Sequence, residues 1–182
     1  MKAITLLGST GSIGTSALSV LRQHPDKYNI YALTANRSVD ILFEQCQQFE
    51  PKIAVMLDES SAELLSLRVK TAGLLTEVLS GEQALEEVAG NEAVDYVVAA
   101  IVGAAGLLPI LAAAKAGKRI LLANKEALVM SGQLLMREIA TNGATLLPVD
   151  SEHNAIWQCL PIGKSQEYQY DGKGIRRIIL TA

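Results

Sequence analysis

The chain has 182 residues, of which 49% are hydrophobic and 19% are charged, and its formal net charge at pH 7 is −3. Such a length and apolar content allow one domain with its own core plus an extension. An acidic balance without a basic patch argues against nucleic-acid binding, so we expect no nucleic-acid partner. Two widely separated cysteines, Cys46 and Cys159, fit a reducing compartment, and we expect a cytoplasmic protein.

Short Val-, Ile- and Leu-rich segments alternate with helical segments along the chain. The apolar runs are nearly continuous, which is typical of parallel strands buried on both faces of a sheet. This alternation predicts an α/β fold, a doubly wound, mostly parallel Rossmann-like sheet with helices on both faces. The predicted strands are residues 3–7, 29–35, 52–57, 77–81, 94–100, 119–123, 144–149 and 176–182. The predicted helices are residues 12–23, 39–49, 61–73, 82–90, 107–116, 126–141 and 153–160.

One uncharged stretch is as long as a membrane-spanning helix. Residues 97–114 contain 18 positions without a charge, which reaches the usual length of a span. The stretch is rich in Ala and Gly and is interrupted by Pro109. We therefore interpret it as the end of a buried strand, a glycine turn and a buried helix, and expect no membrane partner.

The first predicted strand leads into GSTGSIG, in which Gly8, Gly11 and Gly14 are spaced three residues apart. Gly8 allows a sharp turn, Gly11 lets backbone N–H groups approach a pyrophosphate, and Gly14 lets the helix pack close to the strand. A tight turn without a ligand is the alternative. The position at the start of a strand–helix–strand unit favours nucleotide binding.

The second predicted strand is followed by Asn36, Arg37 and Ser38, where an NAD-dependent enzyme usually has Asp or Glu. A cation between small polar groups suits a 2′-phosphate, so the sequence favours NADP(H) over NAD(H). An arginine on a solvated loop is the alternative.

Polar residues also follow the strands 119–123 and 144–149. Lys125 could place a cation over a substrate hydroxyl or phosphate, although ordinary helix capping explains the same position. Asp150 and Glu152 would point to the same side of an extended backbone, because they are two residues apart. Both carboxylates could then reach one Mg²⁺ or Mn²⁺ ion, with Ser151 on a neighbouring ligand. Capping of the next helix is again the alternative.

Together, GSTGSIG, AAIVGAAGLLP, LLANKEALV and LLPVDSEHNAIWQ closely resemble the 1-deoxy-D-xylulose 5-phosphate reductoisomerase family in order and spacing, and the resemblance covers essentially the whole chain. The resemblance implies a metal-requiring oxidoreductase of the non-mevalonate isoprenoid pathway, which converts 1-deoxy-D-xylulose 5-phosphate and NADPH to 2-C-methyl-D-erythritol 4-phosphate. It implies metal ligands Asp150 and Glu152, and Lys125, Ser151 and Glu152 as substrate-contacting catalytic residues. The implied NADPH-binding residues are Gly8, Thr10, Gly11, Ser12, Ile13, Asn36, Arg37, Ser38, Asn124 and Glu126.

The resemblance also implies that family members continue beyond this sequence, with a third metal-binding carboxylate, phosphate-binding residues and a lid. Residues 1–149 are then the NADPH-binding domain, and residues 150–182 are the truncated start of the catalytic region, with a surface excursion over 161–177. We expect the parent to be a homodimeric enzyme that binds a phosphosugar, and this chain to be inactive alone.

Two other functions stay open. The first is a non-catalytic NADPH-binding module. The second is another NADP-dependent dehydrogenase domain, of the semialdehyde or homoserine type, which leaves the Asp-Ser-Glu-His run unexplained. A short-chain dehydrogenase is disfavoured because the sequence has no Tyr-x-x-x-Lys pair.

Overall fold

The computed structural model describes residues 1–123, 125–160 and 175–179. Within these residues the chain forms a seven-stranded sheet in the order β4-β3-β2-β1-β5-β6-β7, and every pair of neighbouring strands is parallel. The strands are β1 (Lys2–Leu7), β2 (Tyr28–Ala35), β3 (Ile53–Met56), β4 (Glu77–Ser80), β5 (Tyr96–Ala99), β6 (Arg119–Leu122) and β7 (Thr145–Pro148). The predicted doubly wound parallel sheet is confirmed.

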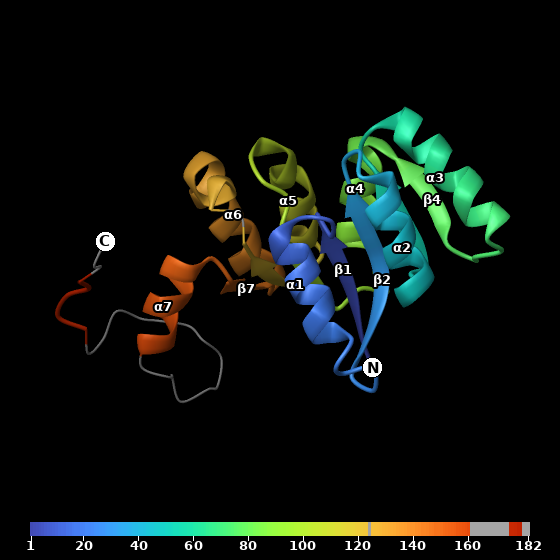
Figure 1. Ribbon diagram of the computed structural model, residues 1–182. Helices are drawn as coiled ribbons and strands as arrows, with labels where there is room; N and C mark the ends of the chain where they lie inside the picture. The colour runs from blue at the N-terminus through green and yellow to red at the C-terminus, as the bar shows by residue number, and fades with distance from the viewer. Residues whose placement is uncertain (124, 161–174, 180–182) are drawn as a thin grey trace.

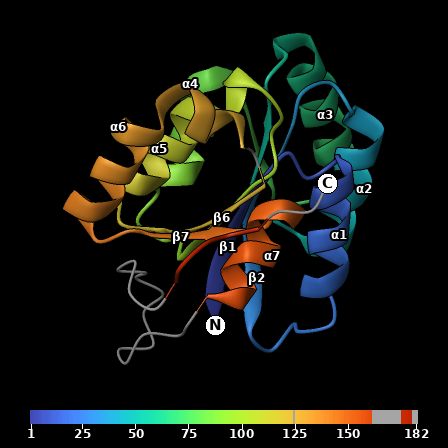
Figure 2. The same ribbon diagram turned by 90° about the vertical axis from the view of Figure 1, so that its left-hand side faces the viewer.

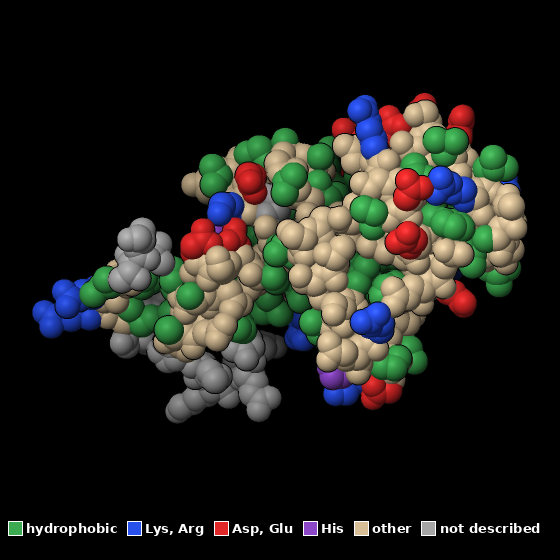
Figure 3. Space-filling view, viewed as in Figure 1, with side chains coloured by type: hydrophobic (Ala, Val, Ile, Leu, Met, Phe, Trp, Pro, Cys, Tyr) green, Lys and Arg blue, Asp and Glu red, His purple; other side chains and the backbone are tan. Residues whose placement is uncertain are grey.

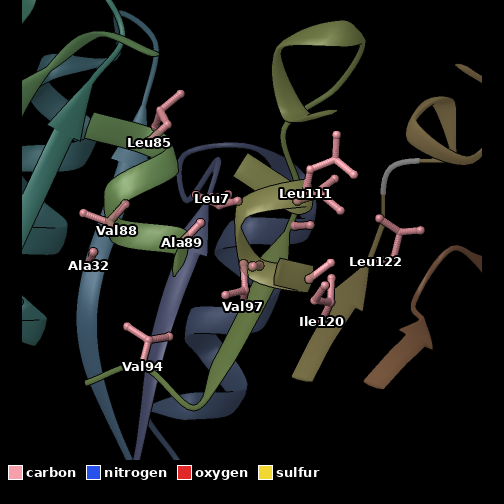
Figure 4. Close-up of a cluster of buried hydrophobic side chains, with 14 of the residues drawn as sticks. Leu7, Ala32, Leu85, Val88, Ala89, Val94, Val97, Leu111, Ile120 and Leu122 are labelled. Carbon is pink, nitrogen blue, oxygen red and sulfur yellow. The ribbon is translucent and has the colours of Figure 1, made fainter. Parts of the chain in front are cut away.

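Helices cover both faces of the sheet, and each face has its own core. On one side α1, α2 and α3 pack against the strands, and on the other side α4, α5 and α6 do so (Figures 1 and 2). Figure 4 shows the second core, where Leu7, Val97 and Ile120 of three strands meet Val88 and Leu111 of two helices. The helices are α1 (Ser12–Leu21), α2 (Val39–Phe49), α3 (Glu59–Thr71), α4 (Gly81–Gly90), η1 (Ala104–Gly106), α5 (Leu107–Lys115), α6 (Glu126–Asn142) and α7 (Ser151–Cys159).

The order in which successive strands are added to the sheet reverses at the boundary between β1 and β5. From β1 the chain proceeds outward to β4, and it then returns to pair β5 with the other side of β1. In open α/β sheets, ligands bind outside the carboxyl ends of the strands at such a switch point. In Figure 1 β1 and β2 run upward from the N-terminus, so their carboxyl ends lie at the upper edge of the sheet.

Two predicted elements near the C-terminus differ from the structure. The last helix begins at Ser151 rather than at 153, because the chain turns directly after Pro148 and Asn154 Nδ2 donates to the Pro148 carbonyl at 2.7 Å. The predicted strand 176–182 is wrong over its described part: residues 175–179 have no regular structure. No strand among the described residues pairs with them, and Ile178 and Ile179 are exposed. Residues 180–182 and most of the predicted surface excursion, 161–174, lie outside the described residues.

The uncharged stretch 97–114 contains the last three residues of β5, the η1 turn and most of α5, as the sequence predicted. None of the helices in the described ranges is long and apolar enough to span a membrane.

Helix α3 begins with a side-chain cap that the sequence analysis did not identify. Asp58 Oδ1 accepts hydrogen bonds from Ser60 Oγ at 2.6 Å, Ser61 Oγ at 2.8 Å and Ser61 N at 3.0 Å. These bonds to Ser60 and Ser61, more than the nearby charge of Arg37, lower the pKa of Asp58 to about 2. Asp58 therefore stays ionised whenever the protein is folded near neutral pH.

We expect Asp58→Ala to lower the midpoint of thermal unfolding by about 2–4 °C at neutral pH, because α3 loses its N-cap. The pKa of Asp58 is lowered on folding, so the stabilisation is complete above the unfolded value near 3.8 and is lost as the pH falls through about 2. The midpoints of thermal unfolding of the unmodified chain and of Asp58→Ala, measured from pH 7 to pH 2, should converge at the acidic end. Asp26→Ala, an exposed aspartate before β2, is the control, and equal losses in both variants would contradict the capping role.

Candidate functional site

In the glycine-rich loop between β1 and α1, backbone segments approach one another so closely that two of the glycines are required by the fold. Gly8 has φ +80°, and a Cβ there would lie 2.8 Å from the Ala100 carbonyl oxygen after β5. A Cβ on Gly14 would lie 2.3 Å from the Gly8 carbonyl oxygen and 2.6 Å from Ser9 Cα. Helix α1 therefore packs directly on the turn that follows β1, whereas the sequence predicted that Gly14 lets the helix pack close to the strand itself.

Gly11 differs from the other two glycines, because the fold does not need it. It is the exposed N-cap of α1, with φ −80° and ψ 173°, and a Cβ would meet only the Gly8 carbonyl oxygen, at 3.6 Å. Within the described part of the chain, no protein acceptor pairs with the amide N–H groups of Thr10, Ser12 and Ile13. A helix N-terminus with free amides and a glycine at its N-cap fits the approach of a pyrophosphate.

The loop after β2 places Arg37 at the same edge of the sheet. The Arg37 side chain is 77% exposed, and its Nε lies 3.4 Å from Asp58 Oδ2, so Asp58 both caps α3 and contacts the arginine. The contact is made through Nε, which leaves the two terminal nitrogens available for a phosphate. The neighbouring Ser38 is the N-cap of α2, but its side chain makes no capping hydrogen bond. Asn36 joins this loop to the start of α3 through its carbonyl, which accepts from Asp58 N at 3.3 Å.

A second group of polar side chains gathers where α6 and α7 begin. Lys125 Nζ lies 3.2 Å from Glu152 Oε1 and 3.4 Å from Asp150 Oδ2. Ser151 Oγ donates to Glu152 Oε2 at 2.8 Å. Figure 3 shows the acidic and basic side chains side by side between these two helices. We call Lys125, Asp150, Ser151 and Glu152 the lysine–carboxylate cluster.

The backbone of this cluster is not the one that the sequence predicted. Asp150 and Glu152 are not neighbours on an extended strand, since Ser151 and Glu152 form the first turn of α7. The two carboxylates nevertheless converge, because both contact Lys125. Asp150 is held beside β6, where Leu122 O accepts from Val149 N at 2.8 Å and from Asp150 N at 3.4 Å.

Helix capping alone does not explain Asp150. It occupies the N-cap position of α7, but its side chain makes no capping hydrogen bond, and it is only 15% exposed beside Lys125. Glu126 is exposed at the start of α6, and the N-cap position of α6 is held by Lys125, without a side-chain capping bond. Asn124 lies outside the described residues, so its predicted cofactor contact stays a prediction.

The charges of the cluster reinforce one another. Hydrogen bonds from Lys125 to Glu152 and Asp150, with the charges of both carboxylates, raise the pKa of Lys125 above its ordinary value. The Ser151 hydroxyl and the Lys125 ammonium both donate to the Glu152 carboxylate, and the pKa of Glu152 lies well below its ordinary value. At neutral pH Lys125 is cationic and Glu152 is anionic.

The donor set fits a hard divalent cation only in part. Two carboxylates and a hydroxyl are oxygen donors of the kind that Mg²⁺ and Mn²⁺ prefer. Among residues 1–123, 125–160 and 175–179, however, no group of three or more His, Cys, Asp or Glu side chains is placed to hold a metal. Asp150 and Glu152 can therefore supply part of a metal site, which further ligands or water must complete.

Comparisons with known proteins identify the family to which the chain is similar. A family model for 1-deoxy-D-xylulose 5-phosphate reductoisomerase matches residues 4–132. The reductoisomerase of Nitrosococcus oceani is 56% identical over 182 residues, which cover 100% of this chain and 46% of that protein. The reductoisomerase of Nitrosomonas europaea is 58% identical over 181 residues, which cover 98% of this chain and 43% of that protein.

Solved structures give the same result in three dimensions. A crystal structure of DOX-P reductoisomerase in complex with NADPH, fosmidomycin and magnesium has a TM-score of 0.88 and 53% identity, covering 92% of this chain and 40% of that chain. The Zymomonas mobilis reductoisomerase in complex with NADPH has a TM-score of 0.84 and 45% identity, covering 88% of this chain and 41% of that chain. The present chain thus spans about half the length of the relatives that it matches. With its glycine-rich loop, its lysine–carboxylate cluster and these matches along its length, the chain belongs to the 1-deoxy-D-xylulose 5-phosphate reductoisomerase family.

Proposed function

We propose that this chain is the cofactor-binding part of an NADPH-dependent, metal-requiring reductoisomerase that converts 1-deoxy-D-xylulose 5-phosphate to 2-C-methyl-D-erythritol 4-phosphate. Residues 1–149 form the NADPH-binding domain, and residues 150–182 begin the catalytic region. The observation that carries the proposal is the lysine–carboxylate cluster, which lies at the same carboxyl edge of the sheet as the open amides of the glycine-rich loop. A nucleotide and a charged substrate can meet at such an edge.

The cofactor half of the proposal rests on two features of the loops. The free amides of Thr10, Ser12 and Ile13 suit the pyrophosphate, and the exposed Arg37 suits the 2′-phosphate of NADPH. Relatives with 53% and 45% identity have been solved in complex with NADPH. The other residues proposed to line the cofactor are Gly8, Gly11, Asn36, Ser38, Asn124 and Glu126.

The metal and substrate half rests on the cluster. Asp150 and Glu152 would hold a divalent cation, Mg²⁺ or Mn²⁺, as the magnesium in solved relatives supports. When bound, NADPH supplies the hydride and the divalent cation polarises the substrate oxygens. Lys125 holds a positive charge beside the carboxylates, and its ammonium can donate to a substrate hydroxyl or phosphate. Ser151 can turn its hydroxyl from Glu152 to the same substrate.

The whole protein is proposed to be a cytoplasmic homodimer that acts on this phosphosugar, whereas the present chain alone is proposed to be inactive. Its described residues offer two carboxylates to a metal and no third, and Mg²⁺ held by so few protein ligands keeps most of its water. The observation that favours the second candidate, a non-catalytic NADPH-binding module, is the same incomplete set of ligands.

One assay separates the two candidates. The chain is mixed with NADPH, Mn²⁺ and 1-deoxy-D-xylulose 5-phosphate, and the NADPH absorbance is followed beside a direct binding titration. We expect NADPH binding without turnover by this chain, and turnover by a longer protein that continues beyond residue 182. Turnover by this chain alone would contradict the incomplete metal site, and no NADPH binding at all would reject both candidates.

We expect Arg37→Ala to weaken NADPH binding by about tenfold or more while leaving NADH binding unchanged, because only NADPH carries the 2′-phosphate. Fluorescence titrations of both cofactors measure the ratio. Arg22→Ala, an exposed arginine that follows α1, is the matched control and should alter neither affinity. An equal loss for both cofactors would place Arg37 elsewhere than at the 2′-phosphate.

A further inference from the structure

A buried hydrogen-bonded pair joins the glycine-rich loop to α2. Gln45 on α2 is 7% exposed, and Ser9 in the loop is fully buried. Ser9 Oγ donates to Gln45 Oε1 at 2.6 Å, and Gln45 Nε2 donates to the Ser9 carbonyl oxygen at 2.9 Å. One side chain thus contacts both the hydroxyl and the backbone of the loop residue.

The place of Gln45 in α2 is otherwise apolar. Its neighbours on the buried face are Leu42 and Cys46, both fully buried. An amide in such surroundings is unfavourable unless its hydrogen bonds are made, and an apolar residue of similar size would fill the space without that requirement. The role of Gln45 is therefore to make the two hydrogen bonds to Ser9.

The amide fixes the orientation of the peptide that links Ser9 to Thr10. Because that peptide is planar and trans, its carbonyl and the Thr10 N–H point in opposite directions. The carbonyl points at Gln45, so the Thr10 N–H points away from α2. Thr10 is one of the residues whose amide has no protein acceptor in the described chain.

The turn before this peptide is fastened from a second side. Thr34 near the end of β2 accepts from Ser9 N at 2.8 Å through its carbonyl, and from Gly8 N at 2.9 Å through its hydroxyl. Residues 8 and 9 are therefore fixed by β2 and α2 together, while the amides that follow stay open. A binding loop held in this way does not have to become ordered when an anion binds.

We propose that Gln45 is a positioning residue for the cofactor pyrophosphate, acting through the Ser9–Thr10 peptide without touching the cofactor. The inference rests on the proposed NADPH site. Loss of the Gln45 amide lets this peptide rotate, so the Thr10 N–H no longer faces the phosphate. Binding of the adenosine end at Arg37 does not depend on this peptide.

The test compares two ligands and three variants. Gln45→Leu removes both hydrogen bonds, Gln45→Glu keeps the acceptor for Ser9 Oγ but cannot donate to the Ser9 carbonyl when ionised, and Gln47→Leu makes the same change on the exposed side of α2. NADPH binding is measured by fluorescence, and binding of adenosine 2′-monophosphate, which has no pyrophosphate, by NMR titration. Circular dichroism melts show which variants are folded.

We expect Gln45→Leu and Gln45→Glu to weaken NADPH binding by about tenfold or more, and to change adenosine 2′-monophosphate binding by less than about twofold. Gln47→Leu should change neither. Unchanged NADPH affinity in a folded Gln45 variant, a parallel loss for both ligands, or failure of both variants to fold would overturn the positioning role. Absence of NADPH binding by the unmodified chain would reject the proposed function and this inference together.

Discussion

We expect Gly14→Ala to be among the most destabilising single substitutions in the chain. The added Cβ would lie 2.3 Å from the Gly8 carbonyl oxygen and 2.7 Å from the Ser9 carbonyl carbon, and both are backbone atoms that cannot rotate away. Overpacking of this kind costs about 3 kcal/mol or more, which lowers the midpoint of thermal unfolding by about 6–12 °C. Thermal denaturation followed by circular dichroism measures the loss.

Gly11→Ala is the matched substitution, three residues away in the same motif. Its Cβ would make one ordinary contact, at 3.6 Å from the Gly8 carbonyl oxygen, so we expect stability to change by less than about 0.5 kcal/mol. NADPH binding should nevertheless weaken by about tenfold or more, because the methyl group would stand where the pyrophosphate is proposed to approach the amides. Tight NADPH binding by Gly11→Ala would show that the pyrophosphate does not bind at this loop.

The second large effect is expected at the lysine–carboxylate cluster. Asp150→Asn should weaken Mn²⁺ binding by about tenfold or more, because one of the two proposed carboxylate ligands becomes a neutral amide. Paramagnetic broadening of the protein's NMR signals by Mn²⁺ locates and measures the binding. Asp26→Asn is the control, since Asp26 is an exposed aspartate that precedes β2, at the opposite end of the strands.

Lys125 provides a test of opposite sign at the same place. Its ammonium lies within 3.4 Å of both carboxylates, so it neutralises part of the charge that would attract a metal ion. We expect Lys125→Met to strengthen Mn²⁺ binding by this chain, even though the same change would remove a proposed substrate contact. Weaker Mn²⁺ binding in Lys125→Met, or an equal loss in Asp150→Asn and Asp26→Asn, would show that the metal binds elsewhere.

The fold could be predicted from the sequence because its signals are local. Nearly continuous apolar runs such as those of β3 and β5 are fully or largely buried, as parallel strands between two layers of helices must be. The spacing of Gly8, Gly11 and Gly14 also predicted a strand–turn–helix unit. The predicted strand that failed is 176–182, whose described residues, 176–179, have no described strand to pair with. An apolar run forms a strand only when a neighbour supplies its hydrogen bonds.

The candidate site was predictable as residues but not as geometry. The sequence placed Asp150 and Glu152 at a strand end and Lys125 at another, yet it predicted an extended backbone where α7 begins. It did not indicate Asp58 as the partner of Arg37, although an aspartate followed by two serines two and three residues later is a recognisable helix start. It gave no sign that Gln45 supports the glycine-rich loop.

The sequence by itself therefore determined most of the secondary structure, the layered sheet and the types of residue at its strand ends. Only the tertiary structure decided which of those residues meet: Lys125 with Glu152 across 27 positions, and Gln45 with Ser9 across 36. The physical reason is that periodicity and turn preferences act over a few neighbouring residues. Contacts between distant residues depend on the order in which strands pair and on the face that each helix covers.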